Sequence, residues 1–422
     1  MANKTQKLEK LKKLIDYVLN NKYSNFYQKK YNGQYFKLST FQDINSIPIL
    51  LKDEIFSIPL EKRIFNNKKI VRYSISSGTT SNNKPLIVPH TDYYYENQHQ
   101  CAINENYLSK IGVKKLLILL NPTHGQQIKA LSENFNKITI IPGDPYLLEK
   151  TGFIIKNLKT EGFYTTPTIL ERLIPILEKN DFDFDSIKFI SLGSELTSRA
   201  KKEILKKMFP KAIFYLRYGA SETFSVRAYQ CKFLAEKSEN YYHIADDFLL
   251  EIYKPDLDGY GEIIHNDTDT NRAFPLIRYK TDDIGKIEKV NCPCGNSSSL
   301  SLKGKVNFDI LKFSGAVLAT EAIEASMLKI KDYLKPGFSM HAYEKIVDKK
   351  IMPELILEIY PQYTLEQRQV DVIKDTVTKN LFLSINKTLN DFINDGLFLP
   401  LKIVLKDKPS GLKQKSIVSH LN

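Results

Sequence analysis

The strongest indication of the fold is a stretch over residues 189–222, which reads FISLGSELTSRAKKEILKKMFPKAIFYLRYGASE. An apolar run at 189–192 predicts a buried strand, and a polar turn then leads into an amphipathic helix over 198–208. Pro210 ends this helix, and the apolar run at 213–216 predicts the next strand. A strand, a crossover helix and a second strand in this order indicate a parallel α/β sheet.

The same alternation extends toward the N-terminus. Apolar runs at 116–120 and 138–141 predict two more buried strands, and helical patterns occupy 153–159 and 169–179. Tyr218 is expected to leave a strand at its carboxyl end, where open α/β sheets bind ligands. The helix over 198–208 is expected to direct three apolar side chains inward: Ile204, Leu205 and Met208.

The pattern changes after Phe248. Alternating strands and turns predict a β-rich subdomain with strands at 249–252, 262–265, 276–279 and 284–290. A boundary near 307 would leave residues 1–306 as a large N-terminal domain and 307–422 as a small α+β domain. In the latter we expect a strand at 310–313, a helix from Thr320, and a β-α-β arrangement over 354–360, 365–389 and 399–405.

The composition is that of a globular protein with a basic surface. The 422 residues are 42% hydrophobic and 26% charged, and 61 Lys and Arg against 48 Asp and Glu give a formal charge of +13. The lysines are scattered and no nucleic-acid-binding motif accompanies them, so anionic small molecules or acidic proteins are the expected partners rather than nucleic acid.

The N-terminus predicts a surface helix rather than a secretory signal. Its lysines are not followed by an apolar core, and the apolar residues that share a helical face are Leu8, Leu11, Ile15 and Val18. The longest apolar run, 116–120, is far shorter than the roughly 20 residues that a membrane span needs. A cytoplasmic location and no membrane partner are therefore expected.

Four motifs suit different parts of ATP. The run Ser76-Ser77-Gly78-Thr79-Thr80, with Lys84 nearby, offers hydroxyls, amides and a cation to phosphates, although such a loop is often only a solvated turn. Tyr218-Gly219-Ala220-Ser221-Glu222 offers close backbone approach at glycine and a carboxylate for Mg²⁺; the alternative is a core tyrosine and a surface glutamate.

The other two motifs lie further along the chain. Arg278 to Asp283 ends in a carboxylate that could accept both ribose hydroxyls, the alternative being a turn that ends a strand. Lys413, two residues after Gly411, supplies a cation near the C-terminus. Each motif alone is a modest indication, but their order along one chain predicts activation of a carboxylic acid by adenylation.

These motifs resemble the adenylate-forming superfamily of acyl-CoA synthetases, luciferases and peptide-synthetase adenylation domains, and most of all phenylacetate-CoA ligase and its relatives. The likeness runs from about residue 55 to 416. It implies a role in binding ATP or AMP for the following residues: Ser76, Ser77, Gly78, Thr79, Thr80, Lys84, Gly193, Ser194, Glu195, Tyr218, Gly219, Ala220, Ser221, Asp283 and Lys305. Glu222 would bind Mg²⁺, Lys305 would belong to an interdomain hinge, and Lys413, or alternatively Lys415, would be the catalytic lysine.

The resemblance also implies the reaction and the partners. The carboxylate would attack the α-phosphate of Mg-ATP, and a thiol such as coenzyme A would then capture the acyl-AMP after the C-terminal domain swings. The implied acid is aryl or small acyl, in a pocket that includes Tyr164, Thr166, Ser194 and Ala220. An acidic acyl carrier protein or an amine is the alternative acceptor, and a homodimer is a further expectation.

A third hypothesis is a nucleotide-binding protein without turnover. Three departures from the superfamily's motifs favour it: Asp282 replaces a glycine, Lys305 replaces the usual hinge arginine, and Leu412 is inserted before Lys413.

A structural zinc site is also predicted. Cys292 and Cys294 lie one residue apart in a tight turn and need further ligands to hold Zn²⁺, for which Cys231 and His243 are the candidates. The resemblance supports this choice, because relatives carry a cysteine and a histidine in the same order. The alternative is a reduced turn with buried free thiols.

Overall fold

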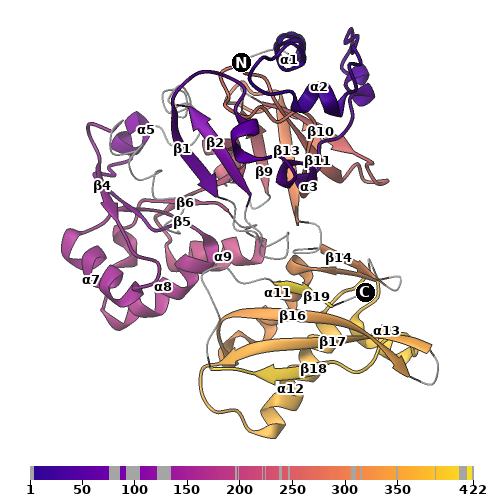
Figure 1. The fold of residues 1–422 in the computed structure, drawn as a ribbon. Helices are drawn as coiled ribbons and strands as arrows, with labels where there is room; N and C mark the ends of the chain where they lie inside the picture. Colours follow the sequence, from indigo (N-terminus) through magenta and orange to yellow (C-terminus); the bar gives the residue numbers. More distant parts are fainter. Residues whose placement is uncertain are drawn as a thin grey trace.

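The computed structural model describes residues 4–75, 86–91, 105–120, 135–194, 197, 199–220, 222–223, 225–236, 240–245, 248–305, 310–313, 316–347, 350–384, 386–407 and 416–420. In Figure 1 a large upper part, formed by the chain up to about Lys305, lies above a smaller C-terminal part. Helices α9 (Arg199–Met208) and α11 (Thr320–Met327) pack against each other between them.

One long sheet organises the large part. Eleven strands of the described chain follow the order β10-β11-β12-β13-β9-β8-β7-β6-β5-β3-β4. The parallel section consists of β3 (Lys115–Ile118), β4 (Thr139–Pro142), β5 (Gly162–Thr165), β6 (Phe189–Leu192) and β7 (Ile213–Ala220). The antiparallel section consists of β8 (Ser225–Tyr229), β9 (Tyr241–Ile244), β10 (Phe248–Tyr253), β11 (Gly261–Asp267), β12 (Tyr279–Lys289) and β13 (Ser298–Lys305).

Helices cover both faces of the parallel section, as a sheet buried on both sides requires. On one face lie α7 (Leu148–Leu158), α8 (Pro167–Lys179) and α9, which form one apolar core with the strands. On the other face Leu108 of α5 (Glu105–Lys110) packs with Leu116, Tyr164 and Phe189. The predicted crossover arrangement is therefore present.

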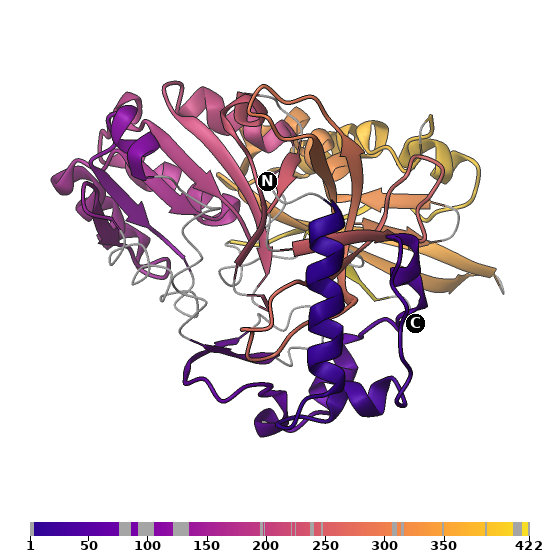
Figure 2. The same cartoon turned by 90° about the horizontal axis from the view of Figure 1, so that it is seen from above.

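The N-terminal segment covers the antiparallel section. Its elements are α1 (Lys4–Leu19), α2 (Phe26–Lys30), η1 (Gln42–Ser46), α3 (Lys52–Phe56) and η2 (Leu60–Arg63), followed by the hairpin of β1 (Ile70–Ile75) and β2 (Ile87–Thr91). Helix α1 packs against β11 (Figure 2) and buries the predicted face that contains Leu11 and Val18. Lys7 is buried with them and donates to the carbonyls of Ala245 and Phe248.

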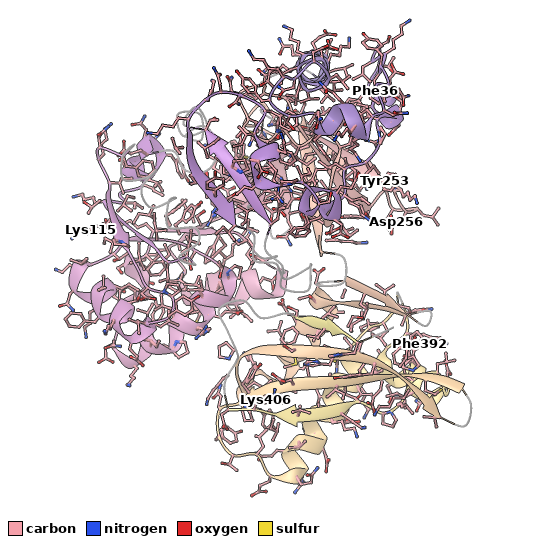
Figure 3. All side chains as sticks on the ribbon, in the orientation of Figure 1. Phe36, Lys115, Tyr253, Asp256, Phe392 and Lys406 are labelled. Atoms are coloured by element: carbon pink, nitrogen blue, oxygen red, sulfur yellow. The ribbon has the colours of Figure 1, made fainter. Side chains whose placement is uncertain are left out.

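The C-terminal part is a four-stranded sheet with helices on one face. Its strand order is β18-β17-β16-β19, with β16 (Leu334–Val347), β17 (Lys350–Pro361), β18 (Lys402–Leu405) and β19 (Ile417–Ser419). Helices α11, α12 (Gln367–Asn380) and α13 (Leu389–Asn394) form the core with it, and β14 (Ile310–Phe313) pairs with β15 (Ala316–Ala319). Figure 3 labels Phe36, Lys115 and Phe392, which mark the N-terminal segment, the parallel section and this C-terminal core.

Several local predictions need correction. Residues 276–278 are buried but lie outside any strand; β12 begins at Tyr279 and runs to Lys289, so Asp282 and Asp283 lie within a strand rather than in a turn after one. Asp282 has a positive φ of 63°, which bends β12 where its pairing with β11 shifts register.

Helix α9 also differs from its prediction. Ile204 is exposed, whereas Lys202 is buried, because α9 packs against α11 as well as against the sheet.

Strand β7 continues through Ala220, so Tyr218 lies within the strand. The predicted β-rich region is present, and its strands continue the parallel sheet. Among the described residues, no helix is both long and apolar enough to cross a membrane.

Candidate active site and metal centre

Two of the four predicted motifs meet at Tyr218. Its side chain is buried, and its Oη donates a hydrogen bond of 2.6 Å to Oδ2 of Asp283. Three strands, β13, β9 and β8, separate β12 from β7 in the sheet order, so the sheet must curl to bring these residues together. Burial, and then the charge of Asp283, raise the pKa of Tyr218, so the hydroxyl keeps its proton and acts as a donor.

A buried arginine supports this contact. Arg227 on β8 is almost fully buried, and its Nη1 donates to Oη of Tyr218 at 3.2 Å. Burial alone would lower the pKa of Arg227, but Tyr218, Glu222 and Asp283 together raise it. The charge of Arg227 therefore interacts with Tyr218 and with both predicted carboxylates, Glu222 and Asp283. Sequence reasoning missed Arg227, because an arginine between apolar neighbours in a strand is normally expected to face water.

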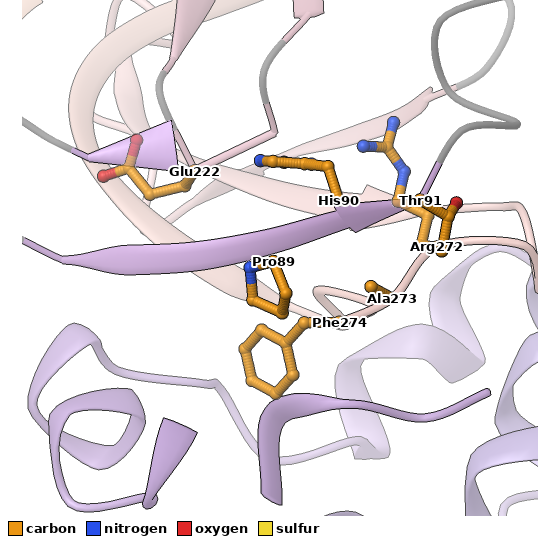
Figure 4. A pocket seen from close by; sticks show the side chains of 7 residues that line it. All are labelled: Pro89, His90, Thr91, Glu222, Arg272, Ala273 and Phe274. Carbon is orange, nitrogen blue, oxygen red and sulfur yellow. The ribbon is translucent and has the colours of Figure 1, made fainter. Parts of the chain in front are cut away.

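Glu222 lies in the same region. Oη of Tyr279 donates to its Oε1 at 3.2 Å, and Nζ of Lys52 lies 3.9 Å from the same oxygen. Glu222 also lines a pocket (Figure 4) whose other lining residues are Pro89, His90, Thr91, Arg272, Ala273 and Phe274. Three of these belong to β2, which together with β1 flanks the predicted phosphate loop. The pocket lies at the end of β2 remote from that loop, because Thr91 pairs with Ile70, whereas Ile87 and Ile75 pair next to the loop.

His90, which lines the pocket, and His265, which contacts Asp267, are neutral structural groups. His90 makes a hydrogen bond of 2.6 Å to Ser74 on the paired strand, and burial, followed by the charge of Arg72, lowers its pKa well below the usual range. His265 contacts Asp267 at 2.9 Å, and Asp267 in turn pairs with Arg272 at 2.9 Å. These contacts fix the floor of the pocket.

The predicted adenine turn and acyl pocket lie at the carboxyl ends of β5 and β6. Gly193 and Ser194 follow β6, Ser194 has a positive φ of 67°, and the amide of Gly193 bonds to the carbonyl of Thr165. Tyr164 is buried at the end of β5. Thr166 caps α8 by accepting from the amide of Ile169, so this hydroxyl serves the helix.

Backbone pairing places three further predicted residues: Gly219, Ala220 and Lys305. In β7, Gly219 and Ala220 pair with β8 after a register shift that follows Tyr218. Lys305, the predicted hinge residue, ends β13 and pairs with Asp283 through the backbone. Several predicted residues lie outside the described part of the chain: Ser76, Ser77, Gly78, Thr79, Thr80, Lys84, Glu195, Ser221, Lys413 and Lys415.

The four predicted zinc ligands come together. Their ligating atoms all lie within 4.8 Å of one another, on segments that are far apart in sequence: Cys231 follows β8, His243 lies in β9, and Cys292 and Cys294 lie in the turn between β12 and β13. The Sγ atom of Cys292 lies 3.5 Å from that of Cys231 and 3.3 Å from that of Cys294.

This geometry fits a tetrahedral metal. Sulfur atoms bound to zinc at about 2.3 Å are roughly 3.8 Å apart, close to the observed separations. Nδ1 of His243 lies 3.0 Å from the carbonyl of Ser298, which fixes the proton there and leaves Nε2 free to bind, 3.3 Å from Sγ of Cys294. Burial lowers the pKa of His243, so the imidazole is neutral, as a ligand must be.

Comparison with solved structures shows the fold. No family model matches the sequence. A solved structure of 2-hydroxyisobutyryl-CoA ligase in the postadenylation state superposes with a TM-score of 0.76, at 14% identity, over 98% of this chain and 89% of that one. The chain therefore has the α/β fold of adenylate-forming enzymes, as predicted.

The similarity in sequence is more specific. Phenylacetate-coenzyme A ligase from Thermus thermophilus is 22% identical over 94% of this chain and 91% of that protein, which confirms the predicted resemblance.

A second structure of the same ligase, in the thioesterification state, gives a TM-score of 0.58 at 15% identity, over 99% of this chain and 89% of that one.

Proposed function

We propose that this protein is an AMP-forming ligase that activates a carboxylic acid, aryl or small acyl, with Mg-ATP and transfers the acyl group to coenzyme A. The contact between Tyr218 and Asp283 is the main support, because it joins two motifs that lie 65 residues apart in the sequence. Tyr218 lies on β7, where the parallel and antiparallel sections of the sheet meet. Nucleotides bind in such positions in α/β proteins. The similarity to phenylacetate-coenzyme A ligase supports the same reaction class.

Each part of the site has a proposed task. The carboxylate of Asp283, oriented by Tyr218, accepts the ribose hydroxyls, and the turn at Gly193–Glu195 contacts adenine. The loop that contains Ser76–Thr80 and Lys84 binds the phosphates. Glu222 suits a magnesium ligand, because it is an acidic side chain in a pocket lined by β2, the strand that follows that loop; the ion would neutralise phosphate charge.

The first step is attack of the substrate carboxylate oxygen on the α-phosphorus of ATP, which forms the acyl-AMP and expels pyrophosphate. Lys413, with Lys415 as the alternative, stabilises the negative charge that accumulates at the phosphorus. The second step is attack of the coenzyme A thiol on the acyl carbon, which releases AMP. Rotation near Lys305, next to Asp283, would couple the two steps to movement of the 307–422 domain.

The cluster of Cys231, His243, Cys292 and Cys294 is proposed to hold a structural Zn²⁺. It links the ends of β8 and β9 to the turn between β12 and β13, and its four protein ligands leave no open position for substrate. The ion would stabilise the antiparallel section that carries Asp283.

The test is release of pyrophosphate from ATP with aryl, fatty and amino acids, with and without coenzyme A. Asp283→Asn, Lys413→Ala and Lys415→Ala are the informative variants, and Lys379→Ala, on an exposed helix, is the control. We expect release with at least one acid, acceleration by coenzyme A, and a loss of about 100-fold or more in Asp283→Asn and in one lysine variant.

Two outcomes would contradict the proposal. Release that is indifferent to coenzyme A would point to a carrier protein or an amine as the acceptor. A full rate in Asp283→Asn would show that this carboxylate does not bind the nucleotide.

A further inference from the structure

Arg217 is a buried cation at the proposed acyl pocket. It precedes Tyr218 on β7, and only 9% of its surface is exposed. Its guanidinium stacks on the ring of Tyr164, with Cζ 3.4 Å from the ring centroid. Its Nε donates to Oγ of Ser191 at 3.0 Å, and its Nη2 donates to the carbonyl of Thr165 at 3.3 Å.

All of these partners are neutral. No carboxylate among the described residues lies within 4.0 Å of the guanidinium, and burial lowers the pKa of Arg217 while only Tyr164 opposes that effect. By contrast, the buried Arg272 and Arg278 pair with Asp267 at 2.9 Å and Glu251 at 3.2 Å. A buried charge without a counter-ion is costly, and an arginine remains protonated at neutral pH, so an anion is the missing partner.

The surroundings hold the guanidinium in place. A Cβ atom on Gly193 would lie 2.9 Å from both Cγ and Nη1 of Arg217, so the glycine leaves just enough room for this side chain. The stack on Tyr164 blocks withdrawal on the other side. Arg217 is therefore fixed between the proposed adenine turn and the proposed wall of the acyl pocket.

From this geometry we infer that the substrate is an acid with a second anionic group, such as a dicarboxylic acid, and that Arg217 binds that second group. The inference rests on the proposed function and narrows its substrate class. Arginine suits a carboxylate because its fork of N–H donors matches the two oxygens.

The reacting carboxylate is a poorer candidate for this partner. When it joins the α-phosphorus it becomes part of a neutral acyl linkage and no longer compensates a cation. A guanidinium that had bound it would be left buried and unpaired in the acyl-AMP complex, which would oppose the first step. A second carboxylate stays charged through both steps.

The test uses pairs of acids in which a terminal methyl group is replaced by a carboxylate, such as butyrate and succinate, or 4-methylphenylacetate and 4-carboxyphenylacetate. The readout is kcat/KM for pyrophosphate release by the full-length protein. We expect the doubly charged member of at least one pair to be preferred about tenfold or more. In Arg217→Met this preference should disappear, and Arg217→Lys should retain part of it.

Arg368→Met, the same substitution at an exposed arginine of α12, is the matched control and should retain the preference. The inference is overturned if the wild type prefers the singly charged acid in every pair, or if Arg217→Met lowers kcat/KM equally for both members, since the arginine would then be structural. Calorimetry of the same acids with wild type and Arg217→Met measures their affinity without turnover. If the second carboxylate adds no affinity for the wild type, the inference is also overturned. Absence of release with every acid would instead count against the proposed function.

Discussion

The parallel and antiparallel sections of the long sheet are held together by different forces. The parallel section packs apolar side chains such as Leu117, Phe163 and Ile190 between helices. The antiparallel section buries charges, among them Asp267 between His265 and Arg272. Apolar packing is non-directional and tolerates local change, whereas buried charges depend on particular partners.

The site lies where the two sections meet. Strand β7 pairs in parallel with β6 and antiparallel with β8, and Tyr218 stands at this junction. The parallel section provides the rigid edge, and the antiparallel section provides the carboxylate of Asp283 and the cation of Arg227. If this division is right, the loss of stability caused by a mutation should depend on metal and on pH in the antiparallel section but not in the parallel section.

The largest effect is expected from loss of a proposed zinc ligand in the antiparallel section. Cys292→Ser removes a thiolate from a buried cluster, and because metal binding contributes directly to folding, the free energy of unfolding should fall by about 5 kcal/mol or more. Chemical denaturation and metal analysis measure this. Cys101→Ser, a cysteine outside the four ligands, is the control, and wild-type protein without stoichiometric zinc would refute the prediction.

A smaller effect is expected from a cavity in the parallel section. Leu173 of α8 is buried in the apolar core, so Leu173→Ala should cost about 3 kcal/mol of unfolding free energy at any pH and any zinc concentration. Ile204→Ala, an exposed apolar position on α9, should cost far less. A cost for Leu173→Ala that varied with zinc would break the proposed division between the sections.

Acid should destabilise the antiparallel section through His265. Burial, and then the charge of Arg227, lower the pKa of His265 to about 4 from an ordinary value of 6.5. Between these values the unfolded chain binds a proton that the folded protein does not, so stability is complete above pH 6.5 and falls by roughly 3 kcal/mol as the pH drops toward 4.

Urea denaturation at pH 7.0, 5.5 and 4.5 tests this prediction. His265→Gln keeps a donor toward Asp267 but cannot titrate, so its unfolding free energy should fall less steeply over this range. Equal slopes for the variant and the wild type would show that His265 is not responsible. Leu173→Ala should show the wild-type slope.

The smallest effect is expected at the surface. Lys379 and Asp375 form an ion pair of 2.8 Å one turn apart on α12, and both side chains are largely exposed. Lys379→Ala should change the free energy of unfolding by less than about 0.5 kcal/mol, and less still at high salt. A larger loss would show that exposed ion pairs also contribute strongly to the stability of this protein.

Prediction from sequence succeeded for short runs that are mainly apolar. The strands at 189–192 and 310–313 have the predicted bounds. It failed for 276–278, whose apolar residues pack against the N-terminal segment without joining the sheet. It also missed the first strand of the C-terminal sheet, β16, where Pro336 and Gly337 interrupt the pattern.

For the candidate site, the sequence identified residue types but not their neighbours. Tyr218, Asp283 and the four proposed zinc ligands were named from the sequence, through the order of the motifs and the resemblance to a known superfamily. Arg217 and Arg227 were not, because a lone arginine in a strand carries no sign of burial.

The sequence alone determined the order of elements, the α/β class and the chemical groups available for adenylation, since these depend on local periodicity and residue type. Only the tertiary structure decided that Asp283 receives the hydroxyl of Tyr218, that four distant candidate ligands converge, and that Arg217 has no carboxylate partner among the described residues. These facts depend on how the long sheet curls and on which charges it removes from water, and both are properties of the whole packed chain.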